Sequence, residues 1–294
     1  MKLLHFWVMN TSSTCSAASH RLVWQSFIVE LGFRNHFLLR GIMAVAAIHK
    51  AVIYPAESED LFTQSSAHMH LALRELRSQL ENPDPPAVPA VFALSGLLVP
   101  HSMGVAQVHP PQNPINDLCH WMRLIKGVQA MVEPNRMRII TSEVAVLIQN
   151  VEAVDSTLTR TSPAPEIVRL KETIQHRVPP DSPNREVYLH AIDELHLVYL
   201  NAFKLYETGD INSVGNITLR WVATAHPSIL DLIAERDQVA LVILAHFAVL
   251  FRLQESSWWM KGWGRWTIDA VNALLEPQYQ GLTQWPMEQL QNVR

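Results

Sequence analysis

The stretch E186-VYLHAIDELHLVYLNAFKL-Y206 carries the clearest helical period in this 294-residue chain. Apolar side chains recur there every three or four residues, so they share one face of an α-helix. That face holds Tyr188, Ala191, Ile192, Leu195, Val198, Tyr199, Ala202, Phe203 and Tyr206. Gly209 and Asp210 follow and favour the end of the helix. We therefore predict a helix over residues 186–206 that buries this face.

The same period recurs along most of the chain. Further helices are predicted over residues 37–50, 61–80, 89–99, 117–132, 139–158, 228–235, 237–254 and 256–275. Prolines predict a loop at residues 101–114 and a loop or a broken helix at residues 159–184, because proline lacks the N–H donor and clashes with the preceding turn. No strand alternation is found. The predicted fold class is all-α, a single-domain bundle of about ten helices over residues 1–294 around a hydrophobic core or pocket.

The composition narrows the classes of function. The chain is 48% hydrophobic and 17% charged, which suits a sizeable buried core. A net charge of −4 without a run of Lys or Arg gives no general attraction to nucleic acid. Cys15 and Cys119 are too few for a structural zinc site, so we expect no metal, no cofactor and a reducing compartment. No apolar run is long enough to predict a membrane span.

Two local features are candidates for function. Trp258, Trp259, Trp263 and Trp266 would fall within an arc of roughly 140° on one continuous helix, a face too broad to leave exposed. His246 is the only polar residue in the apolar run 239–251. Burial would keep it neutral and require a hydrogen-bond partner. It is either a satisfied core histidine or a polar anchor for a ligand hydroxyl or carbonyl in an apolar cavity.

Several segments together carry a family resemblance. In chain order they are Trp24-Gln25, H36-FL-L39, A44-VAAI-H49, His68 with Ala72-Leu73, F92-AL-S95, W121-MRLIKG-V128, His226-Pro227, L244-AHFAV-L250, W258-WMKGWG-R265 and Trp285-Pro286. Their order and spacing resemble the C-terminal regulatory domain of fungal zinc-cluster transcription factors of the sterol uptake control type. The resemblance covers roughly residues 3–286, and the pair 244–250 and 258–265 is its most specific part.

The resemblance implies an all-α domain that binds a lipid-like ligand, a sterol in the founding members, and thereby controls activity in the nucleus. The implied pocket wall comprises residues 38–43, 92–98, 246–251 and 258–266. Its candidate residues are Leu39, Met43, Phe92, Leu98, His246, Phe247, Phe251, Trp258, Trp259 and Trp263. Family members also carry six cysteines that bind two zinc ions and read DNA. This chain begins within the regulatory domain, so we do not expect direct DNA binding.

Three functions compete at this point. The first is a transcription-factor-like regulator, in the nucleus or cytoplasm, that binds a sterol- or terpenoid-like hydrophobic molecule and controls sterol or secondary-metabolite genes. The second is an enzyme derived from this domain that folds and cyclises a polyketide or terpenoid intermediate, with His246 as the first acid–base candidate. The third is an interaction module that forms a homodimer or pairs with a full-length homologue.

Overall fold

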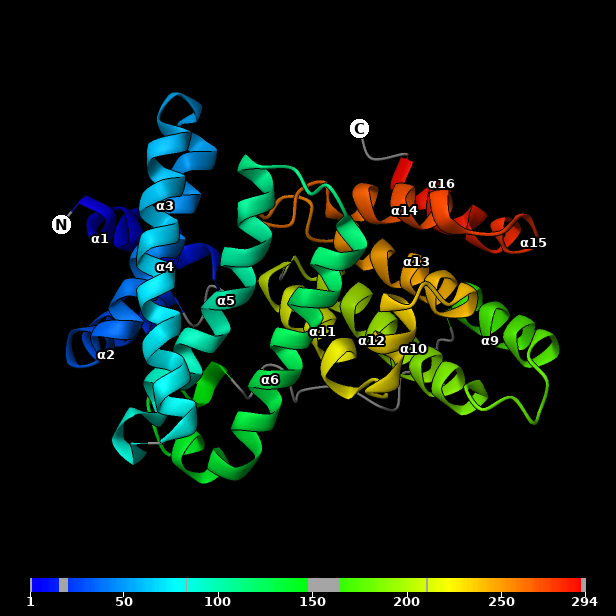
Figure 1. Cartoon of the computed structure of the whole chain (residues 1–294), viewed down its shortest axis with the longest axis horizontal. Coiled ribbons are helices and arrows are strands. Elements are labelled where there is room, and N and C mark those ends of the chain that lie inside the picture. The colour runs from blue at the N-terminus through cyan, green and yellow to red at the C-terminus, as the bar shows by residue number, and fades with distance from the viewer. Residues whose placement is uncertain (1, 16–20, 83, 148–163, 210, 292–294) are drawn as a thin grey trace. The chain divides into compact units, whose positions relative to one another are not determined.

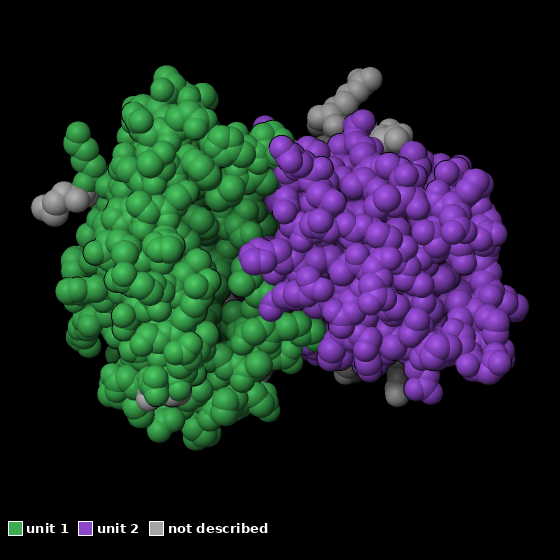
Figure 2. Space-filling model, viewed as in Figure 1, with its two compact units in different colours: residues 1–110, 124–150, 257–260 green, residues 111–123, 151–256, 261–294 purple. Residues whose placement is uncertain are grey.

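The computed structural model describes residues 2–15, 21–82, 84–147, 164–209 and 211–291. Over these residues the chain forms fourteen α-helices and short 3₁₀ and π-helical segments, and it contains no strand (Figure 1). The all-α prediction is therefore confirmed. The chain divides into two compact units, which Figure 2 colours separately. Each unit is described by itself, and the single-domain assignment stays a prediction.

Unit 1 comprises Met1–Pro110, Leu124–Asn150 and Ser257–Met260. Its helices are α1 (Lys2–Phe6), α2 (Ile28–Arg34), α3 (His36–Ile53), α4 (Ser58–Glu81), α5 (Val88–Val108) and the later part of α6 (Pro114–Ile140). The central helix is α3, which packs against α1, α2, α4 and α5. Its apolar side chains Leu38, Ile42, Val45 and Ile48 are completely buried. Burial on several sides explains why α3 is apolar around most of its circumference.

Two helices of unit 1 are long and apolar enough to cross a membrane, which corrects the expectation that no segment reaches this length. They are His36–Ile53 and Pro85–Val108, whose apolar windows are 61% and 72% buried inside the structure. A buried core helix passes the same test of length and composition. The packing of α3 and α5 within unit 1 accounts for their hydrophobicity.

Unit 2 comprises Pro111–Arg123, Val151–Ser256 and Lys261–Arg294. Its helices are the start of α6, α9 (Pro165–Arg177), α10 (Arg185–Glu207), α11 (Ile211–Thr224), α12 (Ser228–Ala234), α13 (Gln238–Arg252), α14 (Trp263–Leu274), α15 (Pro277–Gln280) and α16 (Gln284–Gln291). Helix α13 packs against α10, α12, α14 and α16, and every residue from Val239 to Phe251 is buried. Asp237 caps this helix, since its Oδ1 accepts a 2.9 Å hydrogen bond from the Ala240 N–H.

Two prolines do not end helices where the sequence predicted an end. Helix α5 continues through Pro100 to Val108, and α6 continues through Pro134 to Ile140. A proline inside a helix removes one backbone hydrogen bond, but burial of the flanking turns can outweigh that loss. Pro100 is itself buried in the core of unit 1. Tertiary packing therefore overrides the local signal.

Several helices lie outside the predicted helical ranges, among them α2, α11 and α16. Helix α9 occupies much of residues 159–184, which were expected to form a loop or a broken helix, and it begins at Pro165 in a position that favours proline. Its buried Ile167, Leu170 and Ile174 have helical spacing that the abundance of prolines concealed. Helix α11 was not anticipated. Most of the predicted helix 139–158 lies outside the described residues.

The tryptophan segment differs from the single predicted helix over residues 256–275. Gly262 has φ +78°, in the left-handed region that favours glycine, and α14 begins only at Trp263. The Gly262 N–H donates a 2.9 Å hydrogen bond to Glu255 Oε1, which holds the preceding turn. Trp258 and Trp259 therefore precede the helix and do not share a helical face with Trp263.

Candidate functional site

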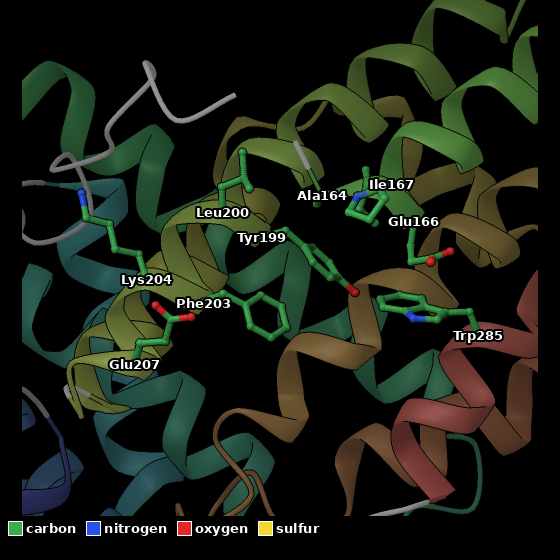
Figure 3. Close-up of a pocket in the computed structure, with 10 residues that line it drawn as sticks. Ala164, Glu166, Ile167, Tyr199, Leu200, Phe203, Lys204, Glu207 and Trp285 are labelled. Atoms are coloured by element: carbon green, nitrogen blue, oxygen red, sulfur yellow. The ribbon is translucent and has the colours of Figure 1, made fainter. Parts of the chain in front are cut away.

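A half-open pocket of about 600 Å³ lies in unit 2 (Figure 3). Its walls are the beginning of α9, the C-terminal half of α10 and one side chain of α16. The lining residues are Ala164, Pro165, Glu166, Ile167, Tyr199, Leu200, Phe203, Lys204, Glu207 and Trp285. The volume falls within the range of small-molecule sites, and aromatic and aliphatic side chains dominate the lining as in such sites.

Three aromatic side chains form one wall of the pocket. The Tyr199 ring lies in the middle, with its centroid 5.8 Å from that of Phe203 and 6.1 Å from that of Trp285. The rings are tilted by 35° and 42°, so the wall is curved. Tyr199 is 2% exposed and Phe203 is 39% exposed, so the wall runs from the core to the solvent. We call Tyr199, Phe203 and Trp285 the aromatic wall.

Behind the aromatic wall lies His246. The Tyr199 hydroxyl donates a 2.5 Å hydrogen bond to the His246 carbonyl, and the His246 ring stacks on Trp285 at 5.8 Å and 25°. His246 Nδ1 donates to the Val242 carbonyl at 2.9 Å, which leaves Nε2 as the unprotonated nitrogen.

The His246 imidazole and the Tyr199 hydroxyl are both neutral near pH 7. Burial lowers the pKa of His246 to about 4, against a smaller opposing effect of its hydrogen bond to Val242. Burial raises the pKa of Tyr199 well above its usual range, so its hydroxyl keeps its proton. The hydrogen bonds fix the Tyr199 ring and leave Trp285 supported on one side by an uncharged imidazole.

The opposite wall is the first turn of α9. The Ala164 N–H donates a 2.9 Å hydrogen bond to His196 Nε2, and Pro165 has no N–H to offer. The Ile167 N–H is occupied by the Ala164 carbonyl. This helix start therefore lacks the row of free N–H groups that would bind an anion. Burial is the main cause that lowers the pKa of His196, which keeps the ring neutral and able to accept.

Three charged side chains lie at the pocket. Glu166 forms an ion pair with the exposed Arg169, with 3.1 Å between Oε2 and Nη1. Glu207 is the last residue of α10 and is exposed. Lys204 points away from the aromatic wall in Figure 3. The surroundings of the wall are thus mostly apolar, with carboxylates at the rim.

The predicted site residues of α13 and α14 lie mainly in the core of unit 2. Phe247 and Phe251 are completely buried, and Phe247 stacks on Trp221 with centroids 4.3 Å apart. Trp263 is 2% exposed and packs edge-on against Trp266. Of the candidates in this unit, His246 comes nearest to the pocket, through its contacts with Tyr199 and Trp285.

The other six candidates belong to unit 1. Phe92 and Leu98 are buried on α5, whereas Leu39 and Met43 are half-buried on α3. Trp258 and Trp259 are half-buried in the segment Ser257–Met260. Phe92 and Leu98 thus belong to the apolar core of unit 1.

Trp258 is the centre of a polar and aromatic cluster in unit 1. Its indole stacks on His49 at 4.4 Å and 15°, and its Nε1–H donates a 3.0 Å hydrogen bond to Thr14 Oγ1. His49 Nδ1 is hydrogen-bonded to Thr11 Oγ1 at 2.9 Å. Burial lowers the pKa of His49 to about 4. A Cβ added at Gly104 would lie 2.5 Å from Trp258 Cζ3, so this glycine permits the ring to approach α5.

The aromatic wall was not predicted as a site. Tyr199 and Phe203 were assigned to the buried face of the helix 186–206, and Trp285 only supported the family resemblance. One available signal was the charged pair Lys204 and Glu207 beside Phe203, which indicates that this end of the helix reaches solvent. Within the described residues no group of three or more His, Cys, Asp or Glu side chains could hold a metal ion.

Comparison with known proteins gives two matches. Residues 2–109 match the fungal specific transcription factor domain. A Zn(2)-C6 fungal-type transcription factor of Gibberella zeae is 21% identical over 310 residues, covering 98% of this chain. The chain spans 61% of that relative's length. Both matches support a relationship with fungal transcription factors, and the narrower resemblance to the sterol uptake control type stays a prediction.

Proposed function

We propose that this protein is a transcription regulator whose pocket in unit 2 senses a hydrophobic small molecule of sterol or terpenoid type. The similarity to fungal transcription factors supports the regulatory part of the proposal. Binding of the ligand would change the activity of the regulator in the nucleus, on genes of sterol or secondary metabolism.

The pocket of about 600 Å³ is the observation that carries the ligand-binding part. Ile167, Leu200 and the aromatic wall supply apolar surface, and burial of ligand area against it contributes about 25 cal/mol per Å². The wall is held from behind by the Tyr199 hydrogen bond to the His246 carbonyl. A wall that is rigid before the ligand arrives loses little conformational entropy on binding.

Native mass spectrometry with lipid extraction tests ligand binding directly. The purified chain is compared with the Phe203→Ala and Trp285→Ala variants, which each remove one ring of the wall. The matched control is Phe33→Ala, because Phe33 is 55% exposed, belongs to unit 1 and does not line the pocket. We expect a co-purified or added sterol or terpenoid to be retained by the wild type and the control and lost by both wall variants.

Transcriptional activity is tested by fusing the whole chain to a heterologous DNA-binding domain upstream of a reporter gene. We expect reporter output to change when the ligand is supplied, and to stop responding in the Trp285→Ala fusion. A wild-type chain that takes up no sterol or terpenoid would contradict ligand sensing. A reporter that stays at background with and without ligand would contradict the role in transcription.

A further inference from the structure

The aromatic wall has a chemical preference beyond hydrophobicity. The faces of Tyr, Phe and Trp rings carry negative electrostatic potential and attract cations placed over them. Tyr199, Phe203 and Trp285 line one pocket with neighbouring centroids 5.8 Å and 6.1 Å apart. An alkylated ammonium group in this pocket would contact more than one ring, which is the arrangement that recognises quaternary ammonium ligands.

The charged side chains around the aromatic wall also favour a cationic ligand. Glu207 carries a carboxylate at the C-terminal end of α10, where the helix dipole also favours a positive ligand. Glu166 lines the other side, and one of its oxygens pairs with Arg169. Lys204 is the cation of the lining, and it points away from the three rings (Figure 3).

The groups behind and opposite the wall do not favour an anion. His246, which stacks on Trp285, is neutral near pH 7 because burial lowers its pKa to about 4. At the start of α9, Ala164 donates its N–H to His196, and Pro165 has none. A carboxylate or phosphate ligand would therefore find few donors and would face Glu166 and Glu207.

We infer that the ligand of this pocket is an organic cation, a hydrophobic molecule that bears an alkylated amine or quaternary ammonium group held against the aromatic wall. The inference rests on the proposed function, because it concerns the same pocket. It narrows the ligand class from apolar molecules in general to apolar molecules with a positive head.

An isosteric pair of probes isolates the charge. The probes are (4-hydroxyphenyl)trimethylammonium and 4-tert-butylphenol, which differ in one central atom and in charge. Isothermal titration calorimetry of the full chain at 0.15 M NaCl measures both dissociation constants. We expect the cation to bind at least about 10-fold more tightly, since both probes bury similar area and only the cation gains from the rings and carboxylates.

Three variants connect that preference to named side chains. Glu207→Gln keeps the shape of the pocket and should weaken binding of the cation about 3-fold or more without changing binding of the neutral probe. Trp285→Leu should abolish most of the preference, and Trp285→Phe should restore part of it because a ring face returns. Glu186→Gln is the matched control, because Glu186 is exposed at the other end of α10 and does not line the pocket.

The outcomes separate this inference from the proposed function. Equal or tighter binding of 4-tert-butylphenol would overturn the cation preference and leave a hydrophobic pocket in place. A preference for the cation that survives both Glu207→Gln and Trp285→Leu would also overturn it, because the charge would be recognised elsewhere. If neither probe nor a sterol binds the wild-type chain, both the inference and the ligand-sensing function fail.

Discussion

The two units each contain a buried histidine stacked on a tryptophan, and the two pairs have different surroundings. In unit 1, His49 and Trp258 lie 4.4 Å apart and nearly parallel. In unit 2, His246 and Trp285 are 5.8 Å apart. Burial lowers the pKa of each histidine to about 4. The chemistry of the two pairs is therefore alike.

What differs is the environment of the tryptophan. Trp258 has a hydrogen-bond partner in Thr14 and packs tightly at Gly104. Trp285 lines a pocket and contacts Tyr199 and His246 at longer range. The same residue pair can thus stabilise a core or support a ligand-facing wall, and only the neighbours of the indole distinguish the two roles.

The largest expected difference between the two pairs is in the stability lost when the tryptophan is replaced by alanine. Trp258→Ala should lower the free energy of unfolding by about 3–5 kcal/mol, because it removes a stacked, hydrogen-bonded ring from a tight contact. Trp285→Ala should lower it by about 1–2 kcal/mol, because the pocket already leaves part of that ring without close neighbours. Urea unfolding followed by circular dichroism measures both. Equal losses would contradict the distinction between a packing pair and a pocket pair.

The next expected effect, common to both units, is a dependence of the free energy of unfolding on pH. Each histidine binds a proton near pH 6.5 when unfolded but only near pH 4 when folded. The unfolded chain therefore binds more protons in this interval, and the free energy of unfolding falls as the pH drops from about 6.5 to about 4. Each histidine contributes at most about 3 kcal/mol to this fall.

Replacing each histidine separately shows how much of this pH dependence comes from each unit. His49→Gln and His246→Gln should each flatten the fall in unfolding free energy between pH 6.5 and pH 4, while the loss from carboxylates at lower pH remains. Urea unfolding at several pH values gives the slopes. If unfolding shows two transitions, each variant should alter a different one. Slopes identical to that of the wild type would mean that these histidines bind protons over the same pH range in the folded and the unfolded chain.

The smallest expected effect concerns the contact between Gly104 and the Trp258 ring in unit 1. Gly104→Ala places a Cβ 2.5 Å from Trp258 Cζ3 and should lower the unfolding free energy by about 1–3 kcal/mol. Gly127→Ala is the matched control, since Gly127 lies within α6 with nothing within 4 Å of an added Cβ. That variant should raise the stability by about 0.5–1 kcal/mol. A neutral Gly104→Ala variant would mean that Trp258 moves without loss.

The helical period was sufficient to predict most of the fold. The helix predicted over residues 186–206 is α10, and the apolar run around His246 is the buried α13. Errors arose where local signals competed with packing, as at Pro100, which lies inside α5. The error at Gly262 is of the opposite kind. The spacing of the tryptophans predicts one continuous helix, but the left-handed Gly262 precedes the start of α14 at Trp263.

The candidate site was predicted less well. His246 was identified correctly as a buried polar residue in an apolar run, and its hydrogen bond to Val242 fits the simpler interpretation of a satisfied core histidine. The residues that line the pocket come from three separate helices, and the period of one helix does not reveal which of its apolar residues face a cavity. Phe203 and Trp285 could be brought together only by the tertiary fold.

The position of Trp258 has a consequence for how the chain folds during synthesis. Its hydrogen-bond partner Thr14 precedes it by 244 residues, and the segment Ser257–Met260 is the last part of unit 1 in the sequence. A ribosome will have released nearly all of α1 to α5 long before the indole that covers His49 exists. Until then the N-terminal helices lack the residues that cover part of their surface. A contact between residues so far apart in the sequence forms late. Chaperones that bind exposed apolar helices would therefore meet this chain during that interval.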